Sequence, residues 1–256
     1  MKPAISVLMS YGSSAGAEIV EALCTNGHPP NLVVQLKINL LKKIGWFWKT
    51  YDKKVLIFLL REAASRKACS LLLIFRKMIL GRGRDDLRRD KIKCLTVKSL
   101  YSPQVINSLQ EISPDFILTS GVGIIRKSIL LSAKAGVLNI HPGILPEFRG
   151  NDPVYWTLKN GGDFGFTVHF MDESIDTGPI IVKRIVKPQG ESIEDFKLYL
   201  FREGLEAAIG IIKNYSVSGN VQSFPQKAGN YYKSMPFKER VEIAKKFRQI
   251  VKMTRQ

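Results

Sequence analysis

The stretch GVLNIHPGILPEFRGNDPVYW, residues 136–156, decides the predicted fold of this chain. It begins as a short apolar strand over 137–140 and continues into a loop rich in proline and glycine. Asn139 and His141 stand two residues apart at the end of the strand, so at strand spacing their side chains point to the same side. Polar side chains at the end of a buried strand indicate the ligand-binding edge of an α/β sheet.

A carboxylate follows in SIDTGP, residues 174–179, which reads as a turn before another apolar strand. An amide, an imidazole and a carboxylate are the groups that acyl transfer to an amine requires: an oxyanion donor, a proton carrier and an anion that orients the base. Asn139, His141 and Asp176 are therefore the candidate catalytic residues. An Asn-x-His pattern alone is more typical of a buried core histidine, so the surrounding sequence has to support this interpretation. His169, in the middle of a strand, is interpreted as structural.

Around these motifs, apolar strands alternate with amphipathic helices. This order predicts an α/β fold with a doubly wound, Rossmann-like and mostly parallel sheet and helices on both faces. Ser102 and Ser192 are expected helix caps. The expected strands are 4–9, 31–37, 93–97, 115–119, 137–140, 164–171 and 179–186. The first expected helix opens from a turn over 11–16 and ends at about 26; the others are 102–112, 152–160 and 191–213, with a helical turn over 126–132.

The positive charge is unevenly distributed. The chain has a formal net charge of +17, and residues 37–98 hold 18 basic and 5 acidic side chains. We expect 38–90 to form a basic helical insert after the second strand. Another basic helix is expected near the C-terminus. A basic excess attracts polyanions such as nucleic acid, anionic lipid or a nucleotide-linked substrate, but it also suits a solvated helix face.

Cysteine usage and hydropathy limit the class of protein. The three cysteines, Cys24, Cys69 and Cys94, form no CxxC pair, which argues against a disulfide framework and a structural zinc site. The longest apolar stretches are shorter than the ~20 residues that cross a bilayer, and no secretory signal is visible. We therefore expect a soluble protein in the reducing cytoplasm.

The combination of GVLNIHPGILPEFRGNDPVYW with NGGDFGFTVHFMDESIDTGPII, residues 160–181, resembles the signature of the folate-dependent formyltransferases. That family includes glycinamide ribonucleotide, methionyl-tRNA and amino-sugar formyltransferases. The close match covers about 115–190, the first strand and helix fit more loosely, and 38–90 do not match.

The resemblance implies that 10-formyltetrahydrofolate is the formyl donor and that no metal is needed. It implies that Asn139 and His141 polarise the formyl oxygen, that His141 relays a proton, and that Asp176 holds the histidine or a water in place. The implied folate-binding residues are Gly121, Val122, Gly123, Ile124, Met171 and Asp172. On sequence alone, the two glycines also fit an ordinary strand-to-helix turn.

The acceptor is expected to be the amine of a nucleotide-linked amino sugar for surface polysaccharide. The loop Ser10–Ala15 lacks the S-G-x-G-S-N pattern of glycinamide ribonucleotide enzymes, and the residues after the last core helix are too few for the barrel of the methionyl-tRNA enzyme. Both acceptors remain alternatives. The expected substrate-binding residues are Ser10, Gly12, Ser13, Arg149 and Tyr155; Arg149 also fits a pair with a surface acid, and Tyr155 a core position. Tyr231 and Tyr232 could stack on a base or sugar.

These observations predict a catalytic domain over 1–215, which includes the insert, and a C-terminal extension over 216–256 that ends in the basic helix. The expected partner is a small-molecule amine. A homodimer and a peripheral membrane contact are compatible with the sequence, and nucleic acid is not expected. The non-enzymatic alternative is a basic protein that binds nucleic acid or a membrane surface, supported by the charge of 37–98.

Overall fold

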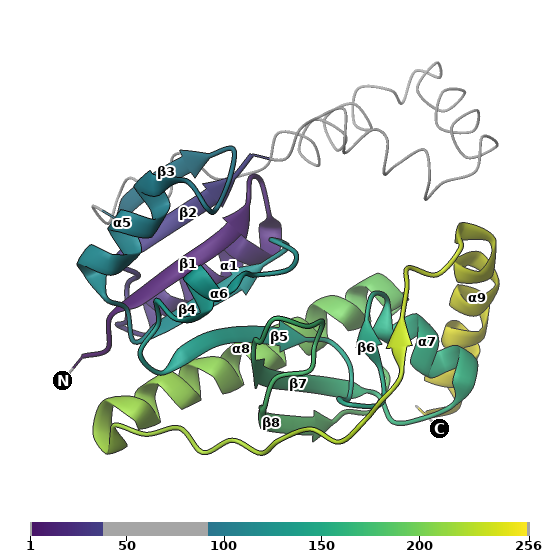
Figure 1. Ribbon diagram of the computed structural model, residues 1–256. Helices are drawn as coiled ribbons and strands as arrows, with labels where there is room; N and C mark the ends of the chain where they lie inside the picture. The colour runs from purple at the N-terminus through teal and green to yellow at the C-terminus, as the bar shows by residue number, and fades with distance from the viewer. Residues whose placement is uncertain (1, 38–91, 255–256) are drawn as a thin grey trace.

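The structure, a computed structural model, describes residues 2–37 and 92–254, so the helices predicted over 38–90 lie outside the described residues. A seven-stranded sheet with the order β3-β2-β1-β4-β5-β7-β8 forms its centre (Figure 1). The strands are β1 Ile5–Ser10, β2 Leu32–Leu36, β3 Lys93–Val97, β4 Phe116–Ser120, β5 Gly136–His141, β7 Gly165–Phe170 and β8 Ile180–Ile185.

Strand direction brings several carboxyl ends to one edge of this sheet. Strands β3, β2, β1, β4 and β5 run parallel to one another, whereas β7 is antiparallel to both β5 and β8. In an open α/β sheet, the edge at the carboxyl ends of the parallel strands is where ligands bind. The predicted fold class is therefore confirmed, and the candidate residues of β5 lie at its ligand-binding edge.

Helices cover both faces of the sheet and divide the core in two. Ile5 and Val7 of β1 pack in the core under α1 and α8, whereas Leu8 points to the opposite core under α5 and α6. This alternation follows from the period of two along a strand. The helices are α1 Ser14–Thr25, α5 Pro103–Ile112, α6 Lys127–Leu130, α7 Pro153–Asn160, α8 Ile193–Ser218 and α9 Phe237–Thr254. No helix within the described ranges is long and apolar enough to cross a membrane.

The helix ends follow the predicted capping residues in part. Ser192 caps α8 by accepting a hydrogen bond from the backbone N–H of Asp195, as predicted. Ser102 occupies the cap position of α5 but makes no side-chain cap bond there. Helix α8 continues to Ser218, beyond the predicted end at 213, and stops at Gly219 in the left-handed conformation that favours glycine.

The C-terminal segment packs on the same core as the rest of the chain. Ile243, Phe247 and Val251 of the basic helix α9 are buried and join the core formed by α1 and α8. Ahead of α9, β9 Tyr231–Tyr232 pairs with β6 Arg149–Gly150 in a small parallel sheet. Sequence analysis did not anticipate this pairing, because strands of two residues carry no hydrophobic alternation. The pairing brings the C-terminal segment next to the loop that follows β5 (Figure 1).

We predict opposite effects of alanine at two glycines of α8. A Cβ on Gly204 would lie 2.5 Å from Ile140 of β5, whereas a Cβ on Gly210 would meet no atom within 4 Å. Gly204→Ala should therefore lower the free energy of unfolding by ~1–3 kcal/mol through overpacking. Gly210→Ala should raise it by up to ~1 kcal/mol, because alanine favours a helix interior. Urea unfolding measures both; a Gly204→Ala protein as stable as wild type would contradict the close packing.

Candidate active site

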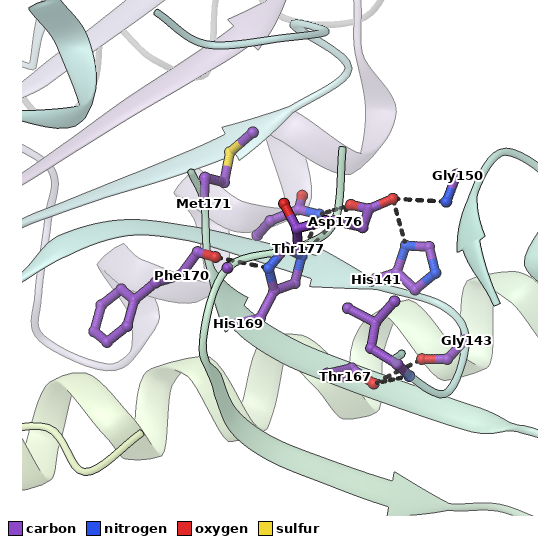
Figure 2. A network of polar contacts seen from close by, with 12 residues as sticks. His141, Gly143, Gly150, Thr167, His169, Phe170, Met171, Asp176 and Thr177 are labelled. Carbon is purple, nitrogen blue, oxygen red and sulfur yellow. Dashed lines mark hydrogen bonds and ion pairs between the residues drawn. The ribbon is translucent and has the colours of Figure 1, made fainter. Parts of the chain in front are cut away.

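Strand β5 ends at the site and carries two of its polar side chains. Asn139 and His141 line the same cavity, as their spacing predicted. Beside them β7 runs antiparallel, with His169 paired to Asn139 and Thr167 paired to His141. Two antiparallel strands thus bring Asn139, His141, Thr167 and His169 to one place; His141 and His169 lie beside Asp176 in Figure 2.

The loop after β5 fixes the orientation of His141. The residue is 4% exposed. Its Nε2 lies 2.8 Å from the carbonyl oxygen of Phe148, and because a carbonyl only accepts, Nε2 carries a proton and donates it. Thr167 holds the start of the same loop by donating to the carbonyl of Gly143 at 2.8 Å. This arrangement leaves Nδ1 of His141 on the side of Asp176.

Asp176 lies in a loop shaped by side-chain hydrogen bonds and by one glycine. The carboxylate of Asp172 accepts hydrogen bonds from the Thr177 hydroxyl at 2.6 and 2.8 Å and from the Ser174 N–H at 3.0 Å. A Cβ on Gly178 would lie 2.0 Å from the carbonyl oxygen of Phe170, so only glycine lets the loop return this closely to β7. Asp172 therefore has a structural role here, and it is absent from the cavity wall.

Three separate segments converge on the carboxylate of Asp176 (Figure 2). Its Oδ2 lies 3.6 Å from Nδ1 of His141 and accepts a hydrogen bond from the N–H of Gly150 at 2.9 Å. Its Oδ1 lies 3.4 Å from Nδ2 of Asn139 and 3.5 Å from Nε2 of His169. Asn139 and His141, the other two residues singled out from the sequence, thus both contact Asp176. Among the described residues, no group of His, Cys, Asp and Glu side chains could hold a metal ion.

His169 belongs to this cluster, although its sequence position indicated only a structural role. It is 1% exposed. Its Nδ1 lies 2.7 Å from the carbonyl of Phe170, and its Nε2 lies 3.1 Å from Nδ2 of Asn139. A carbonyl accepts and an amide NH₂ donates, so the network assigns the proton of neutral His169 to Nδ1. In the sequence, the signal was the fixed strand period, which puts His169 opposite Asn139 once β5 and β7 pair.

Burial and neighbouring charges shift two ionisation equilibria. Burial favours the protonated form of Asp176, but the close contacts with the imidazoles of His169 and His141 and the hydrogen bond from the Gly150 N–H outweigh it and lower the pKa of Asp176 to about 2. Burial lowers the pKa of His141 below its usual 6.5, against the opposing attraction of Asp176. At neutral pH the site therefore holds an aspartate anion beside a neutral imidazole.

A cavity of about 360 Å³ opens over these side chains. Five of the six residues expected to bind folate line it: Gly121, Val122, Gly123, Ile124 and Met171. Gly121 and Gly123 adopt φ values of 65° and 75°, a region that favours glycine. The cavity wall also includes Gly150, Asn151 and Tyr231 from the segments joined by β6 and β9.

None of the five residues expected to bind substrate is part of this cavity wall. The hydroxyl of Ser13 accepts from the Gly16 N–H as the cap of α1, and Ser10 and Gly12 lie in and just after the end of β1. The guanidinium of Arg149 donates to the carbonyl of Gly229. The position of Tyr155 argues against a substrate contact, because it is 7% exposed in the core and its hydroxyl donates to the carboxylate of Glu194.

Comparison with known proteins identifies the family. The family model described as "Formyl transferase" matches residues 5–195 of the chain, which include β5, β7 and the Asp176 loop. The chain belongs to the formyl transferase family. Residues 196–256, with the end of α8, β9 and α9, lie beyond the matched part of this formyl transferase.

Curated relatives of this formyl transferase are similar to it over part of their length. A methionyl-tRNA formyltransferase of Alkaliphilus oremlandii is 31% identical over 131 residues, which cover 49% of this chain and 42% of that protein. The chain spans about half or less of the length of the curated relatives that it matches.

Two solved structures share the fold. Glycinamide ribonucleotide transformylase 1 from Symbiobacterium toebii has a TM-score of 0.57 and 20% identity, with 88% of this chain and 94% of that chain covered. A sugar N-formyltransferase from a Shewanella species has a TM-score of 0.51 and 14% identity, with coverages of 90% and 76%. At these identities the likeness extends to the fold alone, and it agrees with the predicted sheet.

We predict that Gln226 holds the Asp176 loop in place. Its Nε2 donates to the carbonyls of Asp176 at 3.2 Å and Gly178 at 2.6 Å. Gln226→Glu replaces this donor with a carboxylate oxygen that repels both carbonyls. Losing such buried bonds costs ~1–3 kcal/mol. Backbone amides of residues 172–178 should then exchange hydrogen for deuterium roughly 5 to 150 times faster.

Gln222→Glu supplies the matched control, because it makes the same charge change at an exposed position of the same segment. Its exchange in residues 172–178 should equal that of wild type. Equal exchange in both variants would mean that Gln226 does not restrain the loop.

Proposed function

We propose that this protein transfers a formyl group from 10-formyltetrahydrofolate to a primary amine, and that the amine belongs to a nucleotide-linked amino sugar. The observation that carries the formyl transfer is the convergence of Asn139, His141 and Asp176 at a cavity on the carboxyl edge of the sheet. In the proposed reaction, the amine nitrogen bonds to the formyl carbon, the bond between that carbon and N10 of folate breaks, and the proton lost by the amine ends on N10.

The donor supplies an activated formyl carbon, and the protein must polarise its oxygen and carry the proton. The contact from Asn139 Nδ2 to Asp176 is 3.4 Å, long for a hydrogen bond, so this N–H is available to turn to the formyl oxygen. Nε2 of His141 is occupied by Phe148, which leaves Nδ1 to accept the proton of the amine. Asp176, 3.6 Å from Nδ1, then stabilises the imidazolium that forms.

The cavity residues suit a flat heteroaromatic ring such as a pterin. Val122, Ile124, Met171 and Ile175 supply apolar surface around it, and 60% of the Ile124 surface is exposed. Gly121 and Gly123 leave backbone groups of the same loop open to approach by a ligand, because they lack side chains. Small-molecule sites combine apolar walls with a few polar groups in this way. We assign this side of the cavity to the folate.

The amino-sugar acceptor rests on the sequence of the first loop and on the cavity wall. Ser10–Ala15 lacks the pattern expected for a ribose phosphate, and Ser13 is used to cap α1. Asn151 and Tyr231 give the wall a polar and an aromatic group, which are common in carbohydrate sites. A methionyl-tRNA acceptor is the second candidate, because the curated relative named above is called a methionyl-tRNA formyltransferase and the chain is strongly basic.

A panel of acceptors tests this proposal. The full chain is incubated with 10-formyltetrahydrofolate and, separately, with nucleotide-linked amino sugars, glycinamide ribonucleotide and methionyl-tRNA. Mass spectrometry should find one added formyl group on an amino sugar. A formylated methionyl-tRNA or glycinamide ribonucleotide would replace the acceptor but keep the reaction, whereas no product with any acceptor would refute formyl transfer.

Removal of the imidazole should abolish most of the activity. We expect His141→Ala to lower kcat about 10² to 10⁴-fold, as for loss of a general base, with little change in the dissociation constant of folate. His28→Ala is the control, because His28 precedes β2 and therefore lies at the opposite edge of the sheet. Steady-state kinetics and folate titration distinguish the two variants. Full activity of His141→Ala would exclude the role given to this residue.

The pH dependence of kcat should report His141. Because burial lowers the pKa of its imidazole, the acid limb of the profile should lie below pH 6.5, and activity should fall as pH drops and the base becomes protonated. Asp176 raises the pKa of His141, so Asp176→Asn should move the limb to still lower pH in addition to slowing turnover. An acid limb above 6.5 in wild type, or an upward shift in Asp176→Asn, would contradict this assignment.

A further inference from the structure

Two adjacent tyrosines of β9 have opposite surroundings. The ring of Tyr232 stacks between Trp156 and Phe148, with ring centroids 4.9 and 5.7 Å away. Its hydroxyl accepts a hydrogen bond from Nδ2 of Asn160 at 3.1 Å. Tyr231, in contrast, is 47% exposed and lines the cavity over Asp176. Packing accounts for Tyr232, but it does not account for Tyr231.

The ring of Tyr231 packs against Gly150 beside the catalytic cluster. A Cβ on Gly150 would lie 2.9 Å from the Tyr231 ring and 2.2 Å from the carbonyl oxygen of Tyr232, so the ring rests on the bare Cα of this glycine. The same Gly150 donates its N–H to Asp176. Gly150 therefore contacts both the Tyr231 ring and the carboxylate of Asp176. The hydroxyl of Tyr231 makes no hydrogen bond to any described residue. A rigid, partly exposed aromatic ring has a low entropic cost on binding a ligand.

We assign the two substrates to different sides of the cavity. Met171 and Gly150 lie on opposite sides of Asp176 (Figure 2). The side of Met171 and the 121–124 loop is the one that we assigned to folate. The amine has to reach the formyl carbon next to Asn139 and His141, so it approaches from the side of Gly150, Asn151 and Tyr231.

We propose that Tyr231 binds the acceptor and determines its specificity, with its ring against the C–H face of the sugar that carries the reacting amine. This inference rests on the proposed function. Tyr231 contacts the sugar ring and not the nucleotide in this proposal. The reason is that Tyr231 packs against Gly150, which is bonded to Asp176, and so lies close to the place where the amine reacts. Tyr231 is outside the residues matched by the family model, so it is suited to differ between enzymes with different acceptors.

Three substitutions test this assignment with the amino-sugar nucleotide that wild type formylates in the panel. Tyr231→Leu keeps an apolar contact with Gly150 but removes the ring, and Tyr231→Phe removes only the hydroxyl. Tyr232→Phe is the matched control, because it removes the hydroxyl of the neighbouring, packed tyrosine. The KM values of both substrates and kcat are measured for each, and urea unfolding checks that each variant is folded.

We expect Tyr231→Leu to raise the KM of the acceptor roughly 2 to 13-fold, the range for loss of one aromatic contact, with the KM of the folate donor within twofold of wild type. Tyr231→Phe should stay closer to wild type than Tyr231→Leu, and Tyr232→Phe should leave both KM values unchanged. A rise in the donor KM instead would place Tyr231 in the folate site and overturn the inference. An unchanged acceptor KM in a folded Tyr231→Leu protein would also overturn it, with formyl transfer by wild type intact.

The acceptor panel with the wild-type protein tests the proposed function itself. If wild type formylates none of the amino sugars but another amine, the sugar contact is refuted together with the acceptor class. If wild type formylates no amine at all, the failure lies in the proposed reaction and not in the assignment of Tyr231.

Discussion

A buried carboxylate at the end of a sheet is stable only when hydrogen bonds replace the water that it has lost. The side chain of Asp176 is 13% exposed, and its oxygens meet the Gly150 N–H, the Asn139 amide and two imidazoles instead of solvent. These partners come from β5, from the loop after β5 and from β7. The position of one charge thus depends on the pairing of β5 with β7 and on the path of two loops, and the chemistry assigned to the site depends on that position.

The same requirement explains the glycines around the carboxylate. Gly178 lets the Asp176 loop approach the carbonyl of Phe170, and Gly150 lets β6 approach the carbonyl of Tyr232. In both places a Cβ would lie about 2 Å from a backbone oxygen. Gly150 and Gly178 therefore act by letting backbone segments pack closely together. This close packing brings the loops and the Gly150 N–H near enough to hold Asp176.

The segment beyond the family match contributes to this arrangement. Gln226 bonds the backbone of Asp176 and Gly178, and β9 pairs with Arg149 and Gly150. Helix α9, which follows, fills the common core with Phe247. The C-terminal segment is therefore physically coupled to the loop that carries the carboxylate. A substitution there can act on the site without contact with a ligand.

The sequence by itself predicted the mostly parallel sheet and the alternation of strands and helices along the chain, because local periodicity is recorded in a linear pattern. It singled out Asn139, His141 and Asp176 as candidates through residue types at strand ends together with the resemblance to the formyltransferases. Only the tertiary structure showed that His169 and Gln226 contact the site and that β6 pairs with β9. It also showed that Asp172 is absent from the cavity wall and that Tyr155 is buried in the core. These depend on which segments, distant along the chain, lie side by side, because a hydrogen bond or a buried position needs a partner that the spacing of residues cannot specify.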